Sequence, residues 1–302
     1  MARVSNINGK VQVLNSGASD ITELLGWIDE GSIKMDNGTE SFPAVNNGAD
    51  LAYNLDGIFQ VETTLSVRAF DFKALQLMGT YAESGTWSVT LDDSLPTHTF
   101  RVNETASTYI EATTVKWDSV AIKIAKGSPL EMEFGGLALV AGGVSGTLDP
   151  DVPSDGTEPL DFPDMYAKLN GTAIGSVDSL TINYQRSAEA FRGVENTSAG
   201  DRRKNTEILE GVKRFTFDAV IEITDSNIAK EFFGDASFPL AIQDSRSDIT
   251  LTAIAQDTTK GQVALTGVRI IDYDKSVTNE DGIQTVAITG TARAATITGT
   301  LS

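Results

Sequence analysis

The residue types that usually carry catalysis are rare in this chain. Its 302 residues include one histidine, His98, and no cysteine. Nucleophilic catalysis needs a base such as histidine beside a serine or cysteine and an acid that orients it, and no motif supplies these partners for His98. We interpret His98 as a surface turn residue, because it follows Pro96 in a short stretch without periodicity. A second copy of such a site is excluded, since the second half of the chain has no histidine.

Acidic residues suggest two further chemistries, but neither has the spacing that the chemistry requires. Asp149, Asp151 and Asp155 loosely resemble a calcium-binding loop, yet prolines interrupt them and the Asp-x-Asp-x-Asp-Gly order is missing. Asp92 and Asp93 resemble the carboxylate pair of a glycosidase, but neighbouring residues of an extended strand point to opposite faces. The glycine pairs lack the Lys-Ser or Lys-Thr of a phosphate-binding loop. We therefore predict no enzyme activity, no metal ion and no cofactor.

The overall charge argues against stable binding to nucleic acids or membranes. Lys and Arg total 23 against 42 for Asp and Glu, which gives a formal net charge of −19. Phosphate backbones and anionic lipids repel such a chain. The first residues lack an apolar signal core, and the longest apolar run near the middle, residues 137–144, is too short to span a bilayer. We expect a soluble protein with no export signal and no membrane partner.

The elements that would position any site occur twice in the sequence. Three glycine pairs share the offset 234 − 79 = 155, namely Gly79 and Gly234, Gly127 and Gly282, and Gly135 and Gly290. An insertion at residues 21–25 shifts the register, so that Asp29 then corresponds to Asp178 and Ser32 to Thr181. Glycines and alternating apolar residues recur in any β-rich chain, which is the alternative explanation. The shared order of the elements favours an internal duplication.

A proline-rich stretch separates the two copies. Four of the eight prolines lie in residues 148–164, mixed with aspartates. Proline fixes φ and removes a hydrogen-bond donor, so we expect an extended, semi-rigid linker. We predict a first domain at residues 1–147, a linker at 148–163 and a second domain at 164–302. A linker of this length would let the two domains sit side by side without a hinge contact between them.

Within each copy the dominant pattern is the alternation of apolar and polar residues. Residues 59–67 and 215–223 alternate most clearly and predict long half-buried strands. Further predicted strands are residues 87–91, 109–117, 119–125, 130–134, 248–255, 262–273 and 285–289. A short helix follows each long strand, at residues 71–78 and 226–233, with Gly79 or Gly234 as its left-handed stop. The predicted fold is mainly β, with two tandem β-sandwich or barrel-forming modules that each carry one short α-helix.

Two polar stretches, residues 36–56 and 186–210, lie before the two long strands and show no period. Long loops in compact domains are usually functional or disordered. Their equivalent placement in both copies suggests that both contact a neighbouring subunit.

This organisation resembles the tail tube protein of tailed viruses, in its fused tandem variant. The resemblance covers nearly the whole chain but depends on no signature motif. It implies a virion structural protein, made in the host cytoplasm, whose rings stack into a tail tube through which genomic DNA passes. In the single-module family six subunits close a ring with an inner β-barrel, so a fused pair implies a homotrimer of pseudo-sixfold symmetry. Implied partners are further copies, the tape measure, the terminator and the baseplate, with only transient, non-specific DNA passage.

The resemblance also implies roles for particular residues. Alternate residues of the two long strands are expected to face the lumen, namely Gln60, Glu62, Thr64, Thr216, Asp218 and Glu222. An acidic, polar wall would repel passing DNA and let it slide. The polar loops would reach the adjacent ring, and the candidate contacts between rings are Asp50, Arg202, Arg203 and Lys204. The second half has an extra stretch in its loop and lacks the insertion at residues 21–25, so strict sixfold symmetry is not expected.

Two other classes of protein stay open at this point. A tandem β-sandwich adhesin or surface-layer protein would also be acidic and free of cysteine, although the expected absence of an export signal argues against it. A β-rich hydrolase is disfavoured by the missing catalytic spacings described above.

Overall fold

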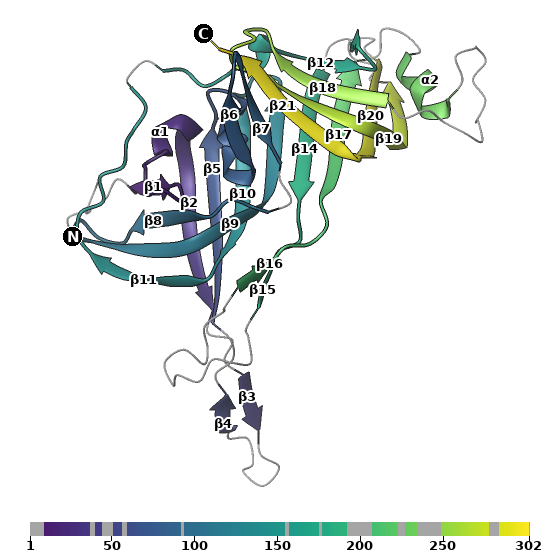
Figure 1. Ribbon diagram of the computed structural model, residues 1–302. Helices are drawn as coiled ribbons and strands as arrows, with labels where there is room; N and C mark the ends of the chain where they lie inside the picture. The colour runs from purple at the N-terminus through teal and green to yellow at the C-terminus, as the bar shows by residue number, and fades with distance from the viewer. Residues whose placement is uncertain are drawn as a thin grey trace, which may run out of the picture.

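The computed structural model (Figure 1) describes residues 9–36, 40–43, 51–55, 59–91, 94–154, 157–174, 177–191, 207–222, 227–234, 249–277 and 284–301. Antiparallel strands dominate, which confirms the predicted mainly β fold. The helices in this part of the chain are short: α1 (Thr22–Leu25), η1 (Phe72–Met78), η2 (Phe162–Asp164) and α2 (Asn227–Phe233).

One long sheet runs through both halves of the chain. Its strands, in spatial order, are β2 (Trp27–Asp36), β5 (Gln60–Arg68), β10 (Glu131–Ala138), β9 (Thr108–Ala125), β14 (Val177–Gln185), β17 (Arg214–Glu222), β20 (Gln284–Ala292) and β19 (Gln262–Val277). The pairing of β9 with β14 joins the two halves edge to edge, so the long sheet is continuous across the chain.

Two outer sheets pack over the long sheet. The first contains β1 (Val11–Leu14), β8 (His98–Asn103), the N-terminal part of β9 and β11 (Val140–Ser145). The second contains β13 (Thr172–Ala173), β12 (Met165–Leu169), β18 (Ile249–Ala255), the N-terminal part of β19, β21 (Ala294–Thr300), β7 (Thr86–Thr90) and β6 (Thr80–Glu83). The long strands β9 and β19 each pass from the long sheet into an outer sheet, which gives the sandwich its two layers.

The same order of pairing occurs in both halves. In the first half each strand pairs with the next in the order β2, β5, β10, β9, β8 and β1. In the second half the corresponding order of pairing is β14, β17, β20, β19, β18 and β12. A β-bulge interrupts β9 at Asp118 and β19 at Ile271. The glycine beside each bulge, Gly136 or Gly290, has no room for a side chain, because an added Cβ would lie 2.6 Å from the Lys116 carbonyl oxygen or 2.3 Å from the Arg269 carbonyl oxygen.

The positions of these bulges shift the alignment of the two halves by one residue, because the sequence had paired Gly135 with Gly290. Gly136 lies opposite Thr63, and Gly290 lies opposite Phe217. Gly136 and not Gly135 therefore occupies the position equivalent to Gly290, and the local offset is 290 − 136 = 154. The sequence alone did not separate two adjacent glycines, because only the strand register decides which one meets the bulge.

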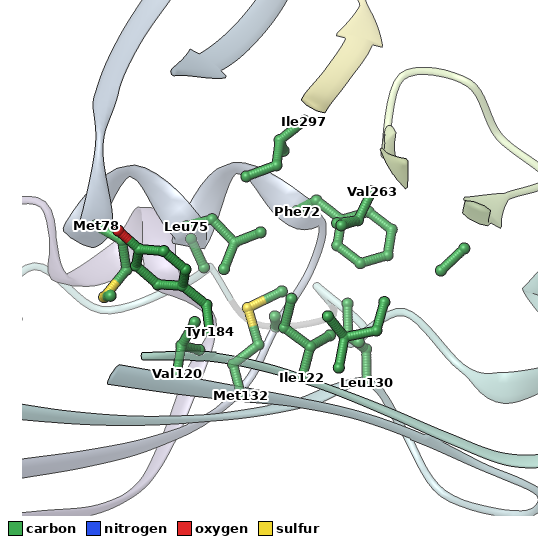
Figure 2. Close-up of a cluster of buried hydrophobic side chains, with 14 of the residues drawn as sticks. Phe72, Leu75, Met78, Val120, Ile122, Leu130, Met132, Tyr184, Val263 and Ile297 are labelled. Carbon is green, nitrogen blue, oxygen red and sulfur yellow. The ribbon is translucent and has the colours of Figure 1, made fainter. Parts of the chain in front are cut away.

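A shared hydrophobic core joins the halves, which lie side by side and are in direct contact through their sheets and not only through the linker. Figure 2 shows Phe72, Leu75 and Met78 of η1 above Val120, Ile122, Met132 and Tyr184 of the long sheet, with Val263 of the second half beside Phe72 and Ile297 above it. The linker is also attached to the first half: the Leu160 N–H donates to the Ala69 carbonyl oxygen at 3.0 Å, and Leu148 and Leu160 are buried.

The predicted helices are present, with one difference in type. The first is a 3-10 helix whose N-cap, Asp71, accepts a hydrogen bond from the Lys73 N–H at 2.7 Å. Gly234 has φ +74°, as predicted for a left-handed stop, but Gly79 is extended with φ −163°. Glycine is required at position 79 for a different reason, since an added Cβ would lie 2.2 Å from the Thr90 carbonyl oxygen.

The prediction that His98 is a surface turn residue was wrong. His98 begins strand β8 and is only 5% exposed. Burial lowers the pKa of His98 to about 4, although a hydrogen bond to the backbone of Pro96 acts in the opposite direction. The alternation of β8 places His98 and Phe100 on the buried face, a pattern too short to recognise in the sequence.

The two polar stretches contain short hairpins where the sequence predicted only loops. Strands β3 (Glu40–Pro43) and β4 (Leu51–Leu55) pair in the first stretch, and β15 (Glu189–Phe191) and β16 (Glu207–Leu209) pair in the second. In Figure 1, β3 and β4 lie below the sheets, at the end of the molecule toward which β2 runs.

Candidate assembly surfaces

One face of the long sheet is polar across both halves of the chain. In β5, Val61, Thr63, Leu65 and Val67 are buried and alternate with the predicted lumen residues Gln60, Glu62 and Thr64. In β17, Phe215, Phe217, Ala219 and Ile221 are buried and alternate with Thr216, Asp218 and Glu222. Thr64 and Thr216 line one shallow hollow together with Ser119 and Asn183, which belong to the strands between them. The six predicted residues therefore lie on one common face, named the polar face here; that it lines a lumen stays a prediction.

Acidic side chains outnumber basic ones on the polar face. By strand register the acidic residues are Glu30, Asp36, Glu62, Glu131, Glu133, Asp218, Glu222, Asp272 and Asp274, and the basic residues are Lys34, Arg68, Lys116, Lys123, Arg214 and Arg269. The Lys34 ammonium lies 2.9 Å from the Glu62 carboxylate and Lys123 lies 2.5 Å from Glu133. Hydrogen bonding to Glu62 raises the pKa of Lys34. These pairs are exposed, so they orient the side chains without adding much stability.

The joint between the halves is an antiparallel ladder. It runs from Ser179 opposite Ala125 to Gln185 opposite Ser119. Ile182 opposite Ile122 and Tyr184 opposite Val120 are buried in the core, while Asn183 opposite Ala121 lies on the polar face. The joint is therefore built as a normal strand pair within one sheet, with an apolar side and a polar side.

A buried ion cluster closes one end of this joint. Glu210 of the second half pairs with Arg186 at 3.0 Å and with Lys116 of the first half. The Glu210 carboxylate also accepts a hydrogen bond from the Leu95 N–H at 2.9 Å. Beside it, Asp118 accepts a hydrogen bond from the Ala188 N–H at 3.1 Å, and burial raises the pKa of Asp118. Charged groups from both halves are thus fixed together where the sheet is continuous.

A second joint lies in the outer sheet. Strand β7 of the first half pairs with β21 of the second, with Trp87 opposite Gly299. The indole N–H of Trp87 donates to the Thr259 carbonyl oxygen at 2.9 Å. Its ring fills the space above Gly299, where an added Cβ would lie 2.3 Å from the indole. This joint is therefore stabilised by the packing of Trp87 against Gly299, two residues that are far apart in sequence.

Both ends of the long sheet have an open edge within the described residues. There β2 pairs only with β5, and residues 269–277 of β19 pair only with β20. Figure 1 shows β2 and β19 on opposite sides of the molecule. Unpaired backbone N–H and C=O groups along a sheet edge are a template for another strand.

The four residues predicted to contact the adjacent ring, Asp50, Arg202, Arg203 and Lys204, lie outside the described residues. The described parts of the two polar stretches that contain these four residues include the hairpins β3–β4 and β15–β16.

Comparison with known protein families shows to which family the chain belongs. A family model described as phage tail tube protein matches residues 74–300, which is most of the chain and runs through both halves. The chain belongs to the phage tail tube protein family. A tail tube protein is a structural component of the virion tail that self-assembles into a tube with other tail proteins. No curated protein matches the chain.

Two negative findings apply to the described part of this tail tube protein. No helix there is long and apolar enough to cross a membrane. Among the same residues, no cluster of three or more His, Cys, Asp or Glu side chains is arranged to hold a metal ion.

The sequence did not identify the residues that hold the tail tube protein's two halves together. Glu210, Arg186 and Trp87 carried no recognisable motif, because their partners come from distant strands. One signal was available: Glu210 and Gly211 occur 210 − 56 = 154 positions after Asp56 and Gly57, at the offset that relates β5 to β17.

Proposed function

We propose that three copies of this tail tube protein close into a ring of pseudo-sixfold symmetry, and that stacked rings form the channel through which genomic DNA passes. One observation carries the proposal. The two halves of the chain are already joined edge to edge by β9 and β14, and an open edge of the same kind remains at each end of the long sheet.

The open edges are counterparts of the strands in the internal joint. Strand β19 corresponds to β9: each carries a bulge, and each pairs with one neighbour, β20 or β10, in the same way. Strand β2 corresponds to β14, since each pairs with the following long strand and each has a bulge at an aspartate, Asp29 or Asp178. Strand β2 of one copy is therefore suited to pair with β19 of the next. Closing the sheet into a barrel would leave no edge unpaired.

The number of copies follows from the family's sixfold rings and from two modules per chain. We infer that gene duplication fused two modules, because the order of pairing and the positions of the bulges agree between the halves. Three copies then supply six modules. Helix α1 has no described counterpart in the second half, so the sixfold symmetry would be approximate.

The polar face is the one suited to line the channel. The opposite face of the long sheet is covered by the outer sheets and the core, so only the polar face is open to water. Its excess of carboxylates would repel the DNA backbone and prevent the DNA from adhering during passage. On this proposal Gln60, Glu62, Thr64, Thr216, Asp218 and Glu222 are lumen residues.

Stacking would use the ends of the ring. The hairpins β3–β4 and β15–β16 mark where the two polar stretches leave the long sheet. In the proposed tube these stretches, with Asp50, Arg202, Arg203 and Lys204, contact the adjacent ring. The ends of the tube would meet the tape measure, the terminator and the baseplate. Synthesis in the host cytoplasm is part of the same proposal.

Electron microscopy of the purified full chain tests the proposal. We expect hollow rods with a ring repeat of about 40 Å, roughly the size of one small domain. Averaged end views should show threefold symmetry with six similar lobes. A chain that stays monomeric at high concentration, or rings with another number of copies, would overturn the proposal.

A further inference from the structure

We infer the register of the subunit joint: β2 of one copy pairs with β19 of the next so that Lys34 lies opposite Asp274 and Met35 lies opposite Tyr273. This inference rests on the proposed ring and adds to it the residues that meet. It is derived from the internal joint of the same chain, which serves as the template.

The first step aligns β2 with β14. The bulge aspartates Asp29 and Asp178 are 178 − 29 = 149 positions apart, and the strands pair with β5 and β17 in the same direction beyond them. At this offset Lys34 corresponds to Asn183, and Met35 corresponds to Tyr184.

The second step aligns β19 with β9. Their bulge residues, Ile271 and Asp118, are 271 − 118 = 153 positions apart. At this offset Tyr273 corresponds to Val120, and Asp274 corresponds to Ala121.

The third step transfers the observed register. In the internal joint Tyr184 lies opposite Val120, and Asn183 lies opposite Ala121. Replacing each residue by its counterpart places Met35 opposite Tyr273, and Lys34 opposite Asp274.

The chemistry of the transferred pairs is complementary on both faces. Met35 is 43% exposed in the single chain. Tyr273 stacks on Phe232 of helix α2, with ring centroids 5.3 Å apart and an angle of 23° between the planes. In the joint between copies Met35 would cover this aromatic pair on the core side of the sheet. The internal joint buries Tyr184, the counterpart of Met35, on the same side. Burial of an exposed thioether side chain against aromatic rings stabilises the contact.

The polar side carries opposite charges. Lys34 would lie between Glu62 of its own chain, 2.9 Å away, and Asp274 of the next copy. A slip of one residue in one direction would place Lys34 opposite Lys275, and would also turn Met35 toward the polar face. The register also places Asp36 opposite Asp272 at the end of the ladder, where the two carboxylates repel each other. Lys34 is the neighbour of this pair on the same face of the sheet. Lys34 therefore supplies the positive charge that faces Asp274 across the joint.

Disulfide trapping tests the register, because the chain has no cysteine of its own. The full chain with Lys34→Cys and Asp274→Cys, oxidised after assembly, should give covalent dimers and trimers on a non-reducing gel. The variant with Lys34→Cys and Asp272→Cys probes the same face two residues away and should cross-link at least tenfold less. Asn183→Cys with Ala121→Cys is the matched internal control, which should form a bond within one chain.

The outcomes separate this inference from the proposed ring. Threefold rings that cross-link preferentially through positions 34 and 272 would overturn the register and leave the ring intact. A chain that forms no ring, measured by sedimentation, would overturn both.

A charge exchange gives a second readout if the cysteine variants assemble poorly. Lys34→Asp alone should raise the concentration needed for assembly at least tenfold, and adding Asp274→Lys should recover most of the loss. Glu62→Gln, which removes only the partner within the chain, should change that concentration less than threefold. Absence of recovery in the double variant would overturn the inferred pair.

Discussion

The Glu210 carboxylate lies 3.0 Å from the Arg186 guanidinium, and the two side chains are only 9% and 7% exposed. The same carboxylate pairs with Lys116 of the first half. One buried acid thus compensates two cations at the point where the two halves share a sheet. In the buried interior the loss of one charge leaves the others without compensation.

Replacing Glu210 with Gln should therefore destabilise the fold strongly. We expect a loss of about 3–5 kcal/mol in the free energy of unfolding, the usual cost of leaving buried charges without their partner. Urea denaturation of the unassembled chain measures this difference. Glu62→Gln is the matched control, because it breaks the exposed pair with Lys34 and should cost less than about 1 kcal/mol. Equal losses in the two variants would refute the special role of Glu210.

Gly290 should not tolerate a side chain. An added Cβ would lie 2.3 Å from the Arg269 carbonyl oxygen and 2.4 Å from the Phe217 ring, so Gly290→Ala must displace backbone or core atoms. We expect a loss of about 1–3 kcal/mol, measured by thermal unfolding. Gly142→Ala in β11 is the control, since nothing lies within 4 Å of an added Cβ there, and it should change stability by less than about 0.5 kcal/mol.

The buried His98 should make stability depend on pH. Its pKa is about 4 in the folded chain against an ordinary 6.5, so the unfolded chain binds a proton in this interval and the folded chain does not. Stability should be fully present above pH 6.5 and should fall by about 3 kcal/mol as the pH drops to about 4.

The variant His98→Gln isolates this effect. The buried carboxyl groups of Asp71 and Asp118, whose pKa values are raised by burial, are unchanged in the variant. The difference in unfolding free energy between the two proteins should therefore shrink between pH 6.5 and pH 4. A constant difference across this interval would show that His98 is accessible to protons in the folded state.

Assembly should protect Thr64 from bulky reagents. Thr64 lies on the polar face, so in the proposed tube a cysteine at this position would point into the channel. We expect Thr64→Cys to react with a polymer-linked maleimide in the unassembled chain and to react at least tenfold more slowly in tubes. Val152→Cys, 65% exposed in the linker on the first half, is the control that should keep its reactivity. Protection of Val152 and not of Thr64 would place the polar face outside.

Local patterns were enough to predict much of the fold. The alternation of residues 59–67 and 215–223 predicted β5 and β17 and which side chains are polar, because side-chain direction in a strand depends only on position parity. The recurrence of elements in the same order predicted two similar halves. The short helices were predicted by their spacing and by the glycine after each.

The tertiary structure decided how these elements meet. The sequence predicted separate strands at residues 109–117 and 119–125, whereas β9 is one strand with a bulge at Asp118. The sequence also allowed two unconnected modules, whereas the β9–β14 and β7–β21 ladders make one continuous sheet system. Glu210, Trp87 and the open edges of β2 and β19 acquire their roles only in that arrangement. Pairing and packing between distant strands depend on register and burial, which no local pattern records, so the sequence by itself determined the modules and the three-dimensional fold determined the joints.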